Sequence, residues 1–163
     1  FILRFFNVYM YHPNPYYYVD GEKKMMSFRL IMDKARKGEP IEVWGDSSRT
    51  KEMLYVKDLT LLIEQAIESD KKGGIYNVGS SKQVSLEEQI DGIIDVFTDA
   101  KRSEKVYCPE KPDALFNHLD ISKTIKDLDY KPQYSYIDWL RDFKLEEEMN
   151  RFEKLWGTRD DYE

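Results

Sequence analysis

Residues 1–9 read FILRFFNVY, an apolar and aromatic run that is interrupted only by Arg4 and Asn7. A strand inside a parallel sheet is covered on both faces, so its sequence is almost continuously apolar instead of alternating. We therefore predict that residues 1–9 form a strand that is buried on both faces. Because a buried strand needs neighbours on either side, we expect the protein that contains it to extend before Phe1.

Helical and strand patterns follow one another along the rest of the chain. Apolar side chains recur at the spacing of one helix face in residues 28–35, 59–67 and 90–97. Patterns typical of strands occupy residues 41–44, 75–78 and 105–108. Since residues 1–9 and 75–78 are joined by a helical crossover, we expect them to be parallel neighbours, with a helix over residues 57–69 covering one face.

The remaining segments complete a mixed α/β order. Residues 10–23 are rich in Tyr, Pro and Asn and read as a loop. Ser85 and Glu88 have the spacing of a capping box, Ser122 reads as the cap of a short helix, and residues 136–156 read as one long charged helix. Neither a repeat nor a low-complexity linker interrupts the sequence, so we predict a single domain over residues 1–163.

Composition excludes several classes of function. The chain has 163 residues with a net charge of -6, so we expect no binding to nucleic acid, which needs a basic face. No apolar run approaches the roughly 18 residues that span a bilayer, and no signal peptide opens the chain. The single cysteine, Cys108, cannot form an internal disulfide. We therefore expect a cytoplasmic protein without membrane contact.

The sequence supplies no convincing catalytic or metal site. Tyr107 and Lys111 have the four-residue spacing at which a lysine could lower the pKa of a tyrosine on a helix, but Pro109 between them would break that helix. His12 and His118 are far apart and no cluster of histidine and cysteine surrounds either one. The eight glycines form no GxGxxG turn for a dinucleotide. We assign no catalytic residue and no metal ligand.

A few basic loops and one aromatic side chain remain as binding candidates. Arg49, Lys51 and Lys111 are candidates for anion binding, and the alternative is that they are solvated loop charges. Trp44 could stack on a base, and its alternative is a core residue at the end of a strand. From the residues alone, the chain is an acidic α/β protein with basic loops.

Four segments, in order, resemble the extended short-chain dehydrogenases, a family of NAD-dependent nucleotide-sugar epimerases and dehydratases. The first is LRFFNVY at residues 3–9, which is similar to the LRFFNVYGP of that family. The second, GEPIEVWGDSSRTKEMLYVKDL at residues 38–59, is similar to GxPIxVxGDGSxxRDFVYVDDL. GIYNVGS at residues 74–80 with VSLEE at 84–88, and the segment from Asp120 to Pro132, follow in the same order as their counterparts. Together these segments cover most of residues 1–140.

This resemblance implies an α/β fold that is the carboxy-terminal part of such an enzyme. Residues 1–9 and 75–79 would be late strands of a Rossmann sheet, and the remainder would be the small lobe that binds a nucleotide-activated sugar. By position in the motifs, Phe6 would lie by the nicotinamide of NAD and Asn7 would hydrogen-bond the substrate diphosphate. The nucleobase would be flanked by Glu42, Val43 and Trp44.

The sequence departs from the family pattern where the substrate diphosphate is bound. Lys51 and Lys111 stand where the family carries arginines, which replaces a bidentate fork by a point charge. Asp129 stands where the family ends a helix with glycine.

The leading interpretation is the nucleotide-sugar-binding portion of an NAD-dependent epimerase or dehydratase, an isomerase or a lyase. The catalytic Tyr-xxx-Lys and the glycine-rich NAD turn would lie in the missing amino-terminal half of its own chain. Without that half we expect neither activity nor useful NAD binding, and we expect self-association through an exposed sheet edge. The alternatives are a diverged, non-catalytic ligand-binding module and an oligomerisation module of the same fold.

Overall fold

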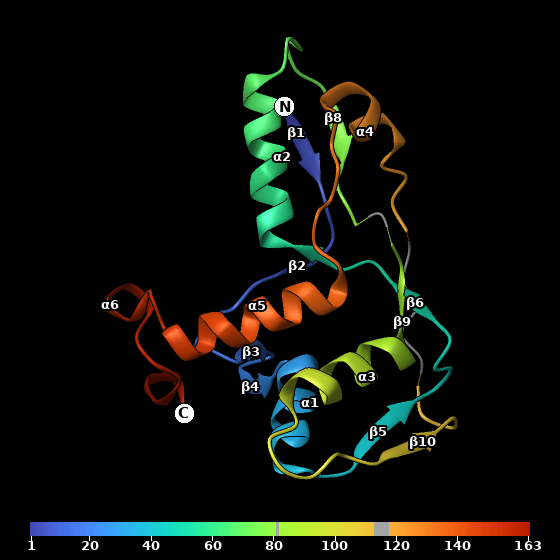
Figure 1. Cartoon of the computed structure of the whole chain (residues 1–163), viewed down its shortest axis with the longest axis vertical. Coiled ribbons are helices and arrows are strands. Elements are labelled where there is room, and N and C mark those ends of the chain that lie inside the picture. Colours follow the sequence, from blue (N-terminus) through green and yellow to red (C-terminus); the bar gives the residue numbers. More distant parts are fainter. Residues whose placement is uncertain (81, 113–117) are drawn as a thin grey trace.

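The computed structural model describes residues 1–80, 82–112 and 118–163, which form an upper and a lower part (Figure 1). The strands are β1 (Ile2–Arg4), β2 (Val8–Tyr9), β3 (Tyr16–Val19), β4 (Glu22–Met25), β5 (Ile41–Trp44), β6 (Thr50–Lys51), β7 (Leu54–Tyr55), β8 (Ile75–Asn77), β9 (Val84–Ser85) and β10 (Lys105–Cys108). The helices are α1 (Ser27–Lys37), α2 (Val56–Glu68), α3 (Leu86–Phe97), α4 (Ser122–Leu128), α5 (Tyr136–Met149), α6 (Glu153–Trp156) and the 3-10 helix η1 (Arg159–Tyr162).

In the upper part, β1 and β8 pair in parallel, with Leu3 opposite Tyr76 (Figure 1). Helix α2 packs Leu62 and Ala66 into the same apolar cluster as Tyr76. The predicted pairing of these two strands, and the helix over one of their faces, are therefore confirmed.

The expectation that residues 1–9 form one strand buried on both faces is wrong: they are divided into β1 and β2, which pair with β8 and β7 in separate sheets. Ile2 is 58% exposed and its register partner Ile75 is 45% exposed, while Leu3 and Tyr76 contribute to the apolar cluster under α2. Successive side chains of a strand point to opposite faces. In the part of the chain that the structure describes, only one face of the β1–β8 pair is covered. The apolar side chains on the other face are therefore exposed.

In the lower part, α1, α3 and α5 enclose an aromatic core. Trp139 of α5 is 1% exposed and stacks on Tyr9, with ring centroids 5.3 Å apart. Helices α3 and α5 approach closely at Gly92, where a Cβ atom would lie 2.7 Å from Cε1 of Tyr136. Strand β10 lies parallel to β5 beside this core, with Tyr107 opposite Val43.

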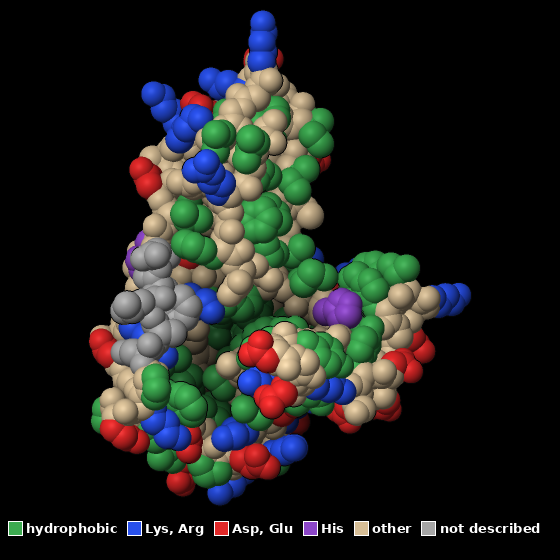
Figure 2. Space-filling view, turned by 180° about the vertical axis from the view of Figure 1, so that it is seen from behind, with side chains coloured by type: hydrophobic (Ala, Val, Ile, Leu, Met, Phe, Trp, Pro, Cys, Tyr) green, Lys and Arg blue, Asp and Glu red, His purple; other side chains and the backbone are tan. Residues whose placement is uncertain are grey.

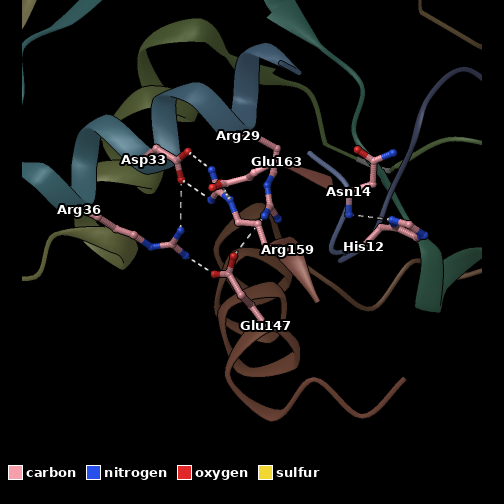
Figure 3. A network of polar contacts seen from close by, with 8 residues as sticks. All are labelled: His12, Asn14, Arg29, Asp33, Arg36, Glu147, Arg159 and Glu163. Carbon is pink, nitrogen blue, oxygen red and sulfur yellow. Dashed lines mark hydrogen bonds and ion pairs between the residues drawn. The ribbon is translucent and has the colours of Figure 1, made fainter. Parts of the chain in front are cut away.

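Ion pairs fasten α1 to α5 and to the 3-10 helix η1 (Figure 3). Arg29, which is 2% exposed, reaches Glu147 at 3.2 Å. Arg36 pairs with the same carboxylate. Arg159 donates two hydrogen bonds to Asp33, of 2.9 and 2.6 Å, so residues 159–162 are held against α1.

Most of the predicted helices form. The predictions that need correction concern where two of these helices begin or end. The capping box of Ser85 and Glu88 is present. Ser122 is not a cap: the cap position of α4 is Ile121, and the Ser122 hydroxyl donates to Asp120 instead. The long helix predicted over residues 136–156 ends at Met149 because Asn150 takes a left-handed conformation, with φ of 38°.

The segment of residues 10–23 contains a hairpin where the sequence predicted a loop. Strands β3 and β4 pair antiparallel and are joined by Asp20 and Gly21, whose φ angles are 52° and 80°. Two consecutive positive φ values are typical of a tight hairpin turn, and Asp-Gly is its usual sequence. Among the described residues, no helix is both long and apolar enough to cross a membrane.

Candidate functional site

A cavity of about 780 Å³ opens in the lower part, between the end of β2 and helices α1, α3 and α5. Asn7, Arg49 and Lys51 line it, together with aromatic and apolar side chains. Figure 2 shows the surface hollowed between the two parts of the molecule, with hydrophobic side chains inside the hollow. We call this space the larger cavity.

A second cavity of about 300 Å³ adjoins the first and is lined by Glu42 and Trp44. The two cavities share five lining residues, namely Ser27, Ile31, Arg49, Leu86 and Ile90. They are therefore contiguous, and Arg49 is the charged side chain that borders both.

The wall of the smaller cavity is built by the alternation of β5. Glu42 and Trp44 face outward, while Val43 is 0% exposed and points into the core. The Trp44 indole donates a 2.7 Å hydrogen bond to the Glu42 carboxylate, which fixes the plane of the ring. The side chain of Val43 lines neither cavity. Of the position that the sequence predicted beside a nucleobase, only the backbone of Val43 could make the contact.

Lys111 contacts the two outward-facing residues of β5. Its ammonium lies 2.5 Å from a Glu42 carboxylate oxygen and 4.5 Å from the centroid of the Trp44 ring. Hydrogen bonds from Lys111 and then from Trp44 hold the pKa of Glu42 below its usual value, and Glu42 in turn raises the pKa of Lys111. The sequence placed Lys111 with Lys51, but Lys111 lines neither cavity and sits at the aromatic end of the site.

Arg49 is oriented by the turn that precedes it. Asp46 accepts hydrogen bonds from the backbone and the hydroxyl of Ser48, at 2.8 and 2.7 Å. From this turn the Arg49 guanidinium donates a 2.7 Å hydrogen bond to the carbonyl oxygen of Trp44. The sequence named Arg49 only as one of three anion-binding candidates, and its central place depends on turn geometry that a sequence pattern does not encode.

Lys51 and Asn7 border the larger cavity and not the smaller one. The Lys51 ammonium is 5.3 Å from the centroid of the Tyr9 ring. Phe6 lies between β1 and β2, is 48% exposed and lines neither cavity. The structure thus brings together Glu42, Trp44 and Lys111 at one end and Asn7 and Lys51 further along, and leaves Phe6 apart.

The spacing of Tyr107 and Lys111 does not make a catalytic pair. Tyr107 lies on strand β10 and donates a 2.6 Å hydrogen bond to Glu87, whereas Lys111 bonds Glu42. No cluster of three potential metal ligands occurs among residues 1–80, 82–112 and 118–163.

Comparisons with known proteins give one consistent similarity. A family model described as "NAD dependent epimerase/dehydratase family" matches residues 1–79. An uncharacterized protein from Methanocaldococcus jannaschii is 29% identical over 141 residues, which are 86% of this chain and 40% of that protein.

Two solved structures extend the similarity. The epimerase Mth375 from Methanothermobacter thermautotrophicus is 25% identical with a TM-score of 0.68, over 91% of this chain and 44% of that one. UDP-glucuronic acid 4-epimerase from Bacillus cereus, in complex with UDP-glucuronic acid and NAD, is 25% identical with a TM-score of 0.60, over 87% and 44%. The predicted α/β fold is confirmed, and this chain spans less than half the length of each of these proteins.

Proposed function

We propose that this chain is the nucleotide-sugar-binding portion of an epimerase or dehydratase, because a model of the NAD dependent epimerase/dehydratase family matches residues 1–79 and the fold is similar to that of the epimerase Mth375. In this proposal it is the carboxy-terminal portion of the enzyme. The amino-terminal half would supply the glycine-rich NAD turn and the catalytic tyrosine and lysine.

One observation carries the proposal, namely the order of side chains along the two contiguous cavities. Trp44 borders the smaller cavity, Arg49 borders both, and Asn7 and Lys51 border the larger one. A nucleotide sugar has the same order of parts: an aromatic base, a doubly charged diphosphate and a sugar. The chemistry of these walls therefore matches the base and the diphosphate of the ligand.

Each side chain has a defined task in this proposal. The Trp44 ring stacks on the nucleobase, and Glu42 holds the plane of that ring. Arg49 and Lys51 neutralise the diphosphate, the first through a planar fork and the second as a point charge. Asn7 donates its amide hydrogens to a phosphate oxygen.

We further propose that this chain alone does not bind NAD usefully. Phe6, the residue that we assign to the nicotinamide, is 48% exposed and lines neither cavity. The facing side of the nicotinamide site would come from the amino-terminal half. Calorimetric titration that gave sub-millimolar affinity would contradict this expectation.

We further propose that the exposed face of β1 and β8 is covered by the amino-terminal half of the enzyme. Ile2 is 58% exposed and Ile75 is 45% exposed on these strands. Exposed apolar area of this kind marks a surface that is normally in contact with another. In the folded enzyme it would continue the parallel sheet.

The test is nucleotide binding to the purified chain, measured by calorimetry with UDP and dTDP. Lys51→Ala should weaken the binding by about 1–3 kcal/mol, the range of charge-assisted hydrogen bonds, and Lys51→Arg should retain or improve it. Lys72→Ala, an exposed lysine on the loop after α2, is the matched control and should change nothing. Unchanged affinity in Lys51→Ala, or no nucleotide binding by the unaltered chain, would refute the proposal.

A second candidate is a non-catalytic binding module of the same fold. The Lys111 ammonium is paired with Glu42 instead of lying beside Lys51, which favours a site that has drifted from the family pattern. The sequence of the full gene separates the two: an intact glycine-rich turn and Tyr-xxx-Lys before Phe1 support the enzyme.

A further inference from the structure

The larger cavity is lined by few charged side chains among the described residues. Among its described lining residues, Arg49 and Lys51 are the charged side chains, and no carboxylate lines it. These two cations match the two charged phosphates of a nucleotide sugar. A sugar placed beyond them therefore meets a wall that has no further permanent charge.

The hairpin segment provides that wall. His12 and Tyr17 line the larger cavity and not the smaller one that Trp44 borders. Tyr17 belongs to β3, whose turn at Asp20 projects from the molecule. Tyr9 and Phe28 complete the surface with two more rings. Ring faces of this kind contact the C–H face of a pyranose.

His12 is the one side chain of this wall that could become a cation, and its contacts favour the neutral ring. The backbone N–H of Asn14 donates a 3.0 Å hydrogen bond to Nδ1 of His12, which requires that nitrogen to be unprotonated (Figure 3). The imidazole also packs against Trp156, at 5.0 Å, and Tyr162, at 6.0 Å between ring centroids. Burial and the nearby Arg29 lower the pKa of His12.

We propose that the larger cavity accepts a nucleotide sugar whose hexosyl group is uncharged, and disfavours the corresponding uronic acid. This inference rests on the proposed function and deepens it. A hexuronate would place a carboxylate against aromatic rings with no cation beside it, and an unpaired carboxylate removed from water is strongly disfavoured. The neutral hexose loses no such hydration.

The experiment compares UDP, UDP-glucose and UDP-glucuronate by calorimetry on the 163-residue chain. UDP-glucose should bind at least as tightly as UDP, and UDP-glucuronate about tenfold more weakly than UDP-glucose. If only dTDP binds, the same comparison is made with dTDP-glucose and dTDP-glucuronate. Equal or tighter binding of the uronate would overturn the inference while leaving the proposed function in place.

A pair of variants tests whether the sugar lies beside Tyr17. Tyr17→Lys puts a cation on the wall and should bring the affinity for UDP-glucuronate up to that for UDP-glucose, without changing the affinity for UDP. Tyr18→Lys is the matched control, because Tyr18 is the next residue of β3, is 67% exposed and does not line the cavity. An equal gain in both variants would refute the placement of the sugar. If neither UDP nor dTDP binds, the inference falls together with the proposed function.

Discussion

The Lys111 ammonium lies between the Glu42 carboxylate and the Trp44 ring, 2.5 Å from the first and 4.5 Å from the centroid of the second. Glu42 and Trp44 are two residues apart on one face of β5, so a single lysine from the turn after β10 contacts both. This contact places Lys111 at the nucleobase end of the candidate site, apart from Lys51 at the proposed diphosphate position.

Lys111→Ala should therefore weaken nucleotide binding less than Lys51→Ala does. The ion pair is exposed, and exposed pairs contribute roughly 0–1 kcal/mol, whereas loss of a phosphate contact costs about 1–3 kcal/mol. Calorimetry of both variants with UDP at several salt concentrations measures the difference. A larger loss in Lys111→Ala would show that Lys111 leaves Glu42 to bind the diphosphate.

The turn after α4 offers a stability prediction. Asp129 ends this helix in the left-handed conformation, with φ of 50° and ψ of 32°. Glycine adopts this conformation without the steric cost that a Cβ atom brings. Asp129→Gly should raise the free energy of unfolding by about 0.5–1 kcal/mol, since the ion pair of Asp129 with Lys131 is exposed and contributes little.

Asp129→Ala is the control for this prediction. Alanine loses the same ion pair but keeps the Cβ atom, so it should be less stable than both the unaltered chain and the glycine variant. Urea unfolding followed by circular dichroism compares the three. Equal stability of the alanine and glycine variants would contradict the steric explanation.

The sequence predicted those elements whose apolar pattern and end signals agree. Residues 28–35 form α1 because their apolar stripe ends at Gly38, whose φ is 65°. The capping box at Ser85 and the pairing of β1 with β8 follow in the same way from local signals. In β5 the alternation turns Val43 to the core and Glu42 and Trp44 outward, whereas the sequence resemblance assigned all three to the nucleobase.

The remaining features depend on contacts that local patterns do not contain. The hairpin β3–β4 was missed because its tyrosines follow Pro13 and Pro15 and do not alternate with polar residues, although Asp-Gly marked its turn. Whether the side chains of residues 1–9 are exposed depends on which segment covers the second face of β1, and the sequence of residues 1–9 does not contain that information. The position of Arg49 between the cavities depends on the hydrogen bond to the Trp44 carbonyl.

The half-buried His12 predicts a pH dependence of stability. Burial and Arg29 lower the pKa of His12 from its usual 6.5, so below that pH the unfolded chain binds more protons than the folded one. The contribution of His12 to stability is therefore full above about pH 6.5 and falls as the pH is lowered through that value. Glu52 and Asp58, whose pKa values are raised by burial, act in the opposite direction.

His12→Gln isolates this contribution. Glutamine does not titrate and can still accept the hydrogen bond from the Asn14 N–H. The variant should lose less stability than the unaltered chain between about pH 7 and about pH 5, as measured by urea unfolding at each pH. Parallel stability profiles for the two proteins would show that His12 is not held neutral by the fold.

The apolar face of β1 and β8 should drive self-association of this chain. Ile2 and Ile75 are register partners on that face and are 58% and 45% exposed, and in the described part of the chain these strands pair only with each other. An open edge beside an apolar face is a template for pairing with a second molecule. Ile2→Lys places a charge there and should weaken the association, as measured by sedimentation equilibrium over a range of concentrations.

Ile67→Lys is the matched control, since Ile67 is 78% exposed but lies on helix α2, and it should leave the association unchanged. A strictly monomeric mass for the unaltered chain at high concentration, or an equal effect of the two variants, would contradict the assignment of this face as a contact surface.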